Sequence, residues 1–138
     1  MANTGYTWSA YSAVQLSASD WTSDAVADNA TDLGDSTSID GKAAAVVTIT
    51  AVEDNTGAID GVCTVYLLND IDGTNFEEPT IGNPFAIVFT PVQNDTVRIP
   101  IPVDPRIYKN FKVAVFNESG QEVAITVKIA TADIPLAS

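Results

Sequence analysis

The chain has 138 residues, a formal net charge of −12 and a single cysteine, and 46% of its residues are hydrophobic. Its length predicts one domain that can bury a core without a disulfide or a structural metal. The negative charge excludes nucleic acids and anionic membranes as expected partners, because binding to either depends on an excess of Lys and Arg.

The hydrophobic residues are mostly β-branched. The sequence contains 15 Val, 12 Ile and 15 Thr but only 5 Leu. Such side chains lose rotamer freedom on a helix and pack well on a pleated sheet. The composition therefore predicts an all-β fold, a single-domain β-sandwich or jelly roll.

Residues 1–41 are rich in Ser, Thr, Ala, Asn and Asp. Aspartates recur every four residues from Asp20 to Asp32, a spacing that would stack like charges on one helix face. We expect a polar, aromatic-bearing N-terminal arm with one short strand, near Val14 and Leu16. The remainder, residues 42–138, is expected to form the β-sandwich domain.

Six strands are predicted after residue 42. Their common feature is a β-branched or alternating apolar pattern bounded by turn-forming residues, and they cover residues 45–52, 62–69, 85–89, 97–103, 111–117 and 123–130. In the last strand Val123, Ile125, Val127 and Ile129 are expected to face inward. A strand about every ten residues is typical of a sandwich or jelly roll.

Two prolines place one of these strands. Pro100 and Pro102 cannot donate hydrogen bonds to a neighbouring strand. Residues 97–103 are therefore expected at a sheet edge, where prolines also discourage unwanted pairing.

The stretch "NDIDGTNF" at 69–76 has some likeness to a calcium loop. Asp70 and Asp72 supply two possible ligands, but Gly73 comes too early for an EF-hand and the flanks are predicted strands. Asp-Gly is itself a strong turn signal. We interpret the stretch as a turn and expect no metal site.

No catalytic arrangement is found in the sequence. Without histidine there is no Ser-His-Asp or Cys-His pair, and no glycine-rich phosphate loop occurs. Cys63 lies in an apolar run and is expected to be buried. Neither a signal peptide nor a membrane-spanning run is seen. We expect a protein without enzymatic activity or cofactor, made in the cytoplasm.

The runs "VYLLNDIDGTNFEEP" and "PFAIVFTPVQNDTVRIPIPVDPRIYKNFKVAVFNESGQ" resemble the capsid decoration, or cement, proteins of tailed bacteriophages. The similarity covers roughly residues 42–131 and rests on the pattern of strands and turns. The resemblance implies a jelly-roll-like virion protein on the capsid exterior. Such a protein binds the major capsid protein, bridges neighbouring subunits and acts as a dimer or trimer.

Two groups of residues are candidates for partner binding. The first is the aromatic set of the N-terminal arm, which would order on docking and supply contact area: Tyr6, Trp8, Tyr11 and Trp21. The second is a cationic cluster suited to an acidic partner: Arg98, Arg106, Tyr108, Lys109 and Lys112. Alternatively, the tryptophans cover one end of their own sandwich and the cations are ordinary outward-facing charges.

A different class of function stays open at this point. Tyr6, Trp8 and Trp21 beside Asp and Asn residues would also suit a carbohydrate-binding or tail-adhesin module. A tail or neck component of the virion is a third reading, which differs from the first only in its partner.

Overall fold

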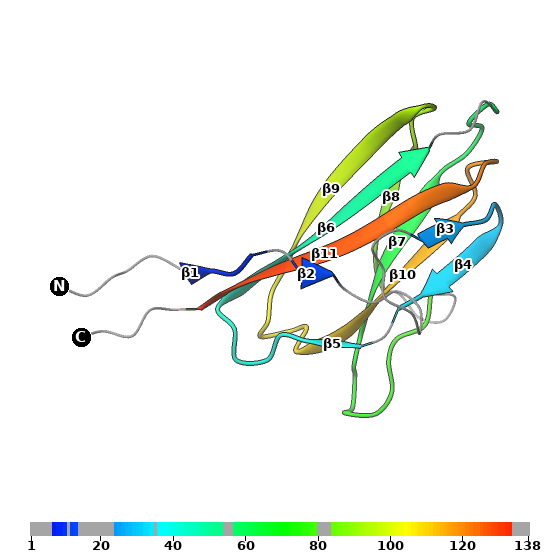
Figure 1. The fold of residues 1–138 in the computed structure, drawn as a ribbon. Helices are drawn as coiled ribbons and strands as arrows, with labels where there is room; N and C mark the ends of the chain where they lie inside the picture. The colour runs from blue at the N-terminus through cyan, green and yellow to red at the C-terminus, as the bar shows by residue number, and fades with distance from the viewer. Residues whose placement is uncertain are drawn as a thin grey trace.

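The fold is a sandwich of two antiparallel sheets, seen in a computed structural model that describes residues 7–10, 12–13, 24–34, 36–53, 57–79 and 84–133 (Figure 1). The predicted all-β, single-domain class is confirmed. Within these residues no helix has the length and apolarity needed to cross a bilayer.

The first sheet has the order β1-β11-β6-β9, and β2 and β3 also pair with β11. Its strands are β1 (Thr7–Trp8), β2 (Ser12–Ala13), β3 (Asp24–Val26), β6 (Ala44–Glu53), β9 (Asp95–Val103) and β11 (Val123–Asp133). The second sheet has the order β4-β10-β7-β8, and β5 also pairs with β10. Its strands are β4 (Ala30–Leu33), β5 (Thr37–Ser38), β7 (Cys63–Asn69), β8 (Phe85–Phe89) and β10 (Asn110–Asn117).

Alternating side chains of the long strands build the core. In β6, Val47 and Ile49 are fully buried while the residues between them face outward. Val123, Ile125 and Val127 of β11 are fully buried too, as the sequence predicts. The core therefore lies between the two sheets, and each sheet keeps a second face on the outside of the sandwich.

The proline-bearing strand lies where the sequence predicts it. Among the described residues β9 pairs only with β6, with Pro100 opposite Thr48 and Pro102 opposite Val46. Because these prolines have no N–H, the strand's other side is poorly suited to further pairing.

The N-terminal region differs from the expectation of one short strand before residue 42. The structure places β1 to β5 there, paired with β11 or β10. Val26 and Ile39 of this region are core residues, 0% and 1% exposed. Strands of two to four residues show too few alternations to be recognised by periodicity. Val14 and Leu16 lie outside the described residues.

Most connections between the long strands cross from one sheet to the other. Those from β6 to β7, β8 to β9, β9 to β10 and β10 to β11 all do so, and only β7 to β8 stays within a sheet. These connections tie the two layers together (Figure 1).

Candidate functional site

Among the residues that the structure describes, the outer face of the first sheet carries no acidic side chain. The registers of β11, β6 and β9 place these residues on it: Ala124, Thr126, Lys128, Ala130, Ala132, Ala44, Val46, Thr48, Thr50, Val52, Thr96, Arg98, Pro100 and Pro102. We call this set the β11-β6-β9 face. Although the chain carries 18 acidic residues, the only charges on this face are those of Arg98 and Lys128.

The β11-β6-β9 face consists of short cross-strand rows. Ala130, Val46 and Pro102 form one row, which is apolar throughout, and on the β11 side of this end of the face Ala130 and Ala132 are buried. The next row pairs Lys128 with Thr48. Depletion of acidic residues and enrichment of arginine and apolar groups are characteristic of the buried centre of protein interfaces. The face thus has the composition of a contact surface.

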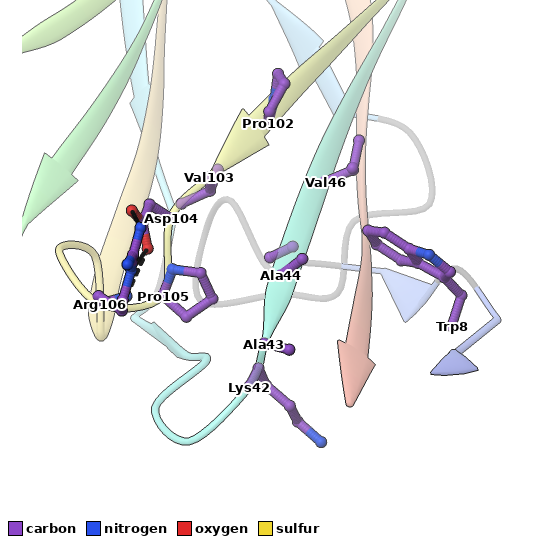
Figure 2. A pocket seen from close by; sticks show the side chains of 11 residues that line it. Trp8, Lys42, Ala43, Ala44, Val46, Pro102, Val103, Asp104, Pro105 and Arg106 are labelled. Atoms are coloured by element: carbon purple, nitrogen blue, oxygen red, sulfur yellow. Dashed lines mark hydrogen bonds and ion pairs between the residues drawn. The ribbon is translucent and has the colours of Figure 1, made fainter. Parts of the chain in front are cut away.

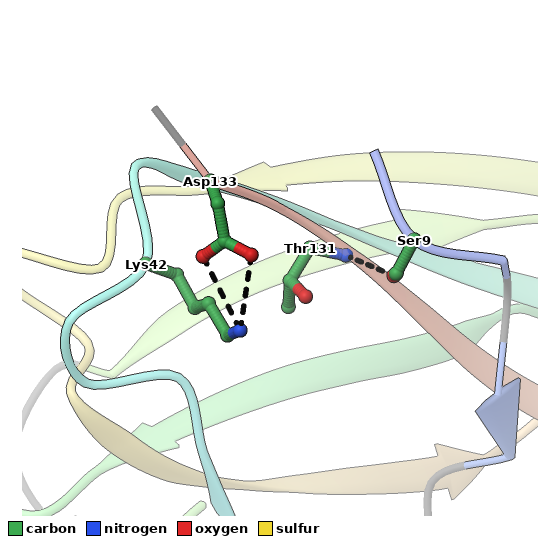
Figure 3. Close-up of polar contacts among 4 residues, drawn as sticks. All are labelled: Ser9, Lys42, Thr131 and Asp133. Carbon is green, nitrogen blue, oxygen red and sulfur yellow. Dashed lines mark hydrogen bonds and ion pairs between the residues drawn. The ribbon is translucent and has the colours of Figure 1, made fainter. Parts of the chain in front are cut away.

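Trp8 borders the β11-β6-β9 face at one end. It pairs with Ala132 of β11, and its side chain is 48% exposed. Two hydrogen bonds of the next residue, Ser9, hold this position. The Ser9 Oγ accepts from the Thr131 N–H at 3.0 Å (Figure 3), and the Ser9 N–H donates to the Thr131 carbonyl at 2.8 Å. The short N-terminal strand therefore presents an exposed indole beside the sheet.

An ion pair lies close to the Ser9–Thr131 contacts. The Nζ of Lys42 approaches Oδ1 of Asp133 at 3.3 Å, and both side chains remain partly exposed (Figure 3). An exposed pair of this kind contributes little to stability. Its effect here is local, since it joins the segment before β6 to the end of β11.

A hollow of about 770 Å³ opens beside Trp8. Its lining comes from β1, from the start of β6 and from the end of β9 with the loop that follows, as Figure 2 shows. Ala44, Val46 and Pro102 supply apolar walls, and Arg106 lies at the opposite side from Trp8. The hollow thus continues the β11-β6-β9 face toward the 104–109 loop.

Arg106 is held by its neighbour Asp104. Its Nη2 lies 2.9 Å from Oδ2 and its Nε lies 3.1 Å from Oδ1 of that carboxylate (Figure 2). These hydrogen bonds from Arg106 keep the pKa of the Asp104 carboxyl below its ordinary value. The guanidinium is therefore already engaged in a two-point contact.

The predicted cationic residues do not gather in one place. Arg98 lies on the β11-β6-β9 face, whereas Lys112 lies on the outside of the other sheet with its Nζ 4.5 Å from the centroid of the Phe76 ring. Lys109 is exposed in the loop before β10. Tyr108 packs edge-on against core residue Phe111, with centroids 6.4 Å apart. Among the predicted aromatics, Tyr6, Tyr11 and Trp21 lie outside the described residues.

Lys128 is the site residue that the sequence reasoning did not select. It shares the outer face with Arg98 although the two are thirty positions apart in the sequence. The available signal was the alternation of β11, which points Lys128 outward, but strand order was needed to bring it near β9.

The Asp70–Phe76 stretch forms a turn. Its two carboxylates accept hydrogen bonds from the loop's own groups, with Asp70 bound to the Gly73 N–H at 2.7 Å and Asp72 to the Asn75 N–H at 2.7 Å. Gly73 has a φ of 91°, which glycine adopts without strain. Over the described part of the chain, no three His, Cys, Asp or Glu side chains gather in a way that would hold a metal.

The carboxyl of Asp72 is expected to titrate near pH 2. The Asn75 side chain, followed by the N–H groups of Thr74 and Asn75, lowers its pKa from 3.8 to about 2. Because the folded pKa is depressed, the turn contacts are complete above pH 4 and are lost as pH falls through 2. A carboxyl-carbon NMR titration measures this midpoint. Asn75→Ala should raise it, and a midpoint near 4 in the unmodified chain would contradict the assignment.

Cys63 is a buried core residue, as the sequence predicts. It is 0% exposed, and its Sγ donates to Oδ1 of Asn117 at 3.4 Å. Burial raises the pKa of its thiol to about 11. The thiolate, which is the reactive form, is therefore scarce at neutral pH.

No protein-family model matches this chain, and no curated protein matches its sequence.

Proposed function

We propose that this chain is a non-enzymatic structural protein of a phage virion, made in the host cytoplasm. It binds the major capsid protein on the outside of the shell, bridges neighbouring subunits and acts as a small homo-oligomer. The observation that carries the proposal is the acid-free β11-β6-β9 face on a chain of net charge −12.

The distribution of charge supports docking through this face. Elsewhere the acidic surface repels copies of the chain and other anionic molecules, which favours solubility. Arg98 and Lys128 are the only charges on the face and attract an acidic partner surface. Trp8 adds a large, half-exposed aromatic contact at the rim, a residue type common among interface hot spots.

The test compares two charge reversals of equal size. Arg98→Glu with Lys128→Glu alters the β11-β6-β9 face, and Lys109→Glu with Lys112→Glu makes the same net change elsewhere. Binding is measured by co-sedimentation with emptied capsids assembled from a candidate major capsid protein. We expect the first pair to weaken binding by about tenfold or more and the second to leave it within about twofold.

Three results would count against the docking proposal. Equal weakening by both pairs would show a general effect of net charge. Unchanged binding of the Arg98 and Lys128 variant would show that another surface docks. Absence of binding by the unmodified chain would remove the capsid role altogether.

The hollow beside Trp8 favours carbohydrate binding as a second candidate. An exposed indole offers a stacking plane at one side of the hollow, and Lys42 and Asp104 add polar groups to its lining. A saturable change in tryptophan fluorescence on titration with free glycans, abolished by Trp8→Ala, would support this function. Capsid binding without any glycan response would support the structural role.

A further inference from the structure

The strand β8 (Phe85–Phe89) is an open and uncharged sheet edge. Among the described residues it pairs only with β7. Its sequence, FAIVF, contains no proline and no charge, and Phe85 and Val88 are 43% and 61% exposed. The corresponding edge of the other sheet, β9, carries Pro100 and Pro102. Of these two described edges, β8 is the one without the features that normally prevent strand addition.

The hydrogen bonds of β7 show which of its backbone N–H and C=O groups point toward β8. The N–H and C=O of Asn69 both engage Glu77, on the side of β7 away from β10, whereas the Val62 carbonyl accepts from Glu118 on the β10 side. Since these directions alternate along a strand, Leu67, Val65 and Cys63 turn their backbone groups toward β8.

The register then assigns the groups of β8 itself. Phe85, Ile87 and Phe89 stand opposite Leu67, Val65 and Cys63 and use their N–H and C=O groups on β7. The N–H and C=O groups of the two residues between them, Ala86 and Val88, point away from β7 toward the open edge.

The charge pattern identifies a second copy as the occupant of this edge. No charged residue occurs from Pro79 to Asn94, although the chain as a whole carries −12. Two copies that meet through the β11-β6-β9 face would oppose Arg98 and Lys128, and two that meet through the outer face of the second sheet would oppose Lys112. A two-fold contact at β8 brings only neutral groups together.

We propose that β8 pairs with β8 of a second copy, antiparallel, about a two-fold axis at Ile87. In this register Ala86 of each copy lies opposite Val88 of the other, and their outward N–H and C=O groups form four hydrogen bonds. Phe85 of each copy lies opposite Phe89 of the other, so the contact covers the exposed Phe85 ring. The second sheet becomes continuous across the dimer.

The inference rests on the homo-oligomer of the proposed function and identifies β8 as the surface through which two copies bind each other. It leaves the β11-β6-β9 face open on both copies, so one dimer offers two docking faces. Its test uses the purified chain in solution and can fail while capsid binding succeeds, or succeed while capsid binding fails.

Sedimentation velocity and light scattering of the full chain test the proposal, and we expect a dimer. Val88→Pro removes an N–H that does not bind β7, so the fold should persist while dimer affinity falls at least tenfold. Arg98→Pro, the matched control at the β9 edge, should leave the dimer unchanged. Val88→Asp keeps the backbone N–H and should also dissociate the dimer by placing two negative charges at the contact.

A cross-link gives a positive test that does not depend on the proline variant. Ile87→Cys places two thiols opposite each other at the axis, close enough for a disulfide, and mild oxidation should yield a covalent dimer. The buried Cys63 should not react. A monomeric or trimeric unmodified chain, a folded Val88→Pro variant that still dimerises, or no cross-link at residue 87 would overturn the proposal.

Discussion

Replacing Asn117 by alanine is expected to lower the free energy of unfolding by about 3–5 kcal/mol, one of the largest effects of any single change in this chain. The Asn117 side chain is fully buried at the end of β10. Its Nδ2 donates to the Val26 carbonyl at 2.8 Å and to the Gln121 carbonyl at 2.7 Å. Its Oδ1 accepts from the N–H and the Oγ of Ser119.

These contacts join parts of the chain that are far apart in sequence. Val26 belongs to the first sheet, Asn117 to the second, and Gln121 to the connection between β10 and β11. Alanine would leave two carbonyls and one N–H without their partner in a dry site, which costs more than the net value of the lost bonds.

Urea denaturation followed by circular dichroism measures the effect of this change. Asn117→Asp separates hydrogen bonding from shape, because a carboxylate has the same size but cannot donate to the two carbonyls. We expect it to destabilise at least as much as alanine at neutral pH. The exposed Asn75→Ala serves as a control and should cost less than about 1 kcal/mol. An Asn117→Asp variant as stable as the unmodified chain would contradict this assignment.

The long strands were predictable because their signal is local. Each of the six predicted strands overlaps an observed one, and the 85–89 strand is placed without error. The alternation of β11 correctly predicted which of its side chains are buried. The prolines of β9 correctly predicted that this strand lies at a sheet edge. Both depend only on the residue type and its immediate neighbours.

The sheet order and the N-terminal strands could not be predicted in this way. The order β11-β6-β9 joins segments that are distant in the chain, so no local pattern reveals that Lys128 and Arg98 share a face. Strands such as β4 owe their place to pairing with β10 rather than to their own sequence. In the sequence, Asn117 is recognisable only as the end of a predicted strand. Its importance for stability follows from long-range contacts such as its hydrogen bond to the Val26 carbonyl.

Replacing Phe111 by alanine is expected to cost about 3–5 kcal/mol, the range typical of a fully buried phenylalanine. Phe111 is 0% exposed, packs within the core between the sheets and contacts the Tyr108 ring edge-on. Truncation therefore removes both the buried area and the aromatic contact and leaves a cavity. The free energy from urea denaturation should fall with little change in its dependence on denaturant.

Phe116 provides the matched control for Phe111, because it is the same residue type on the same strand but faces the outside of the sandwich, where it is half-buried. Phe116→Ala should cost about 1 kcal/mol. Phe116 shares a cross-strand row with Thr64 and Val88, so the comparison is made at low protein concentration, where unfolding is not linked to dimer dissociation. Equal losses for the two variants would contradict the assignment of Phe116 to the outside of the sandwich.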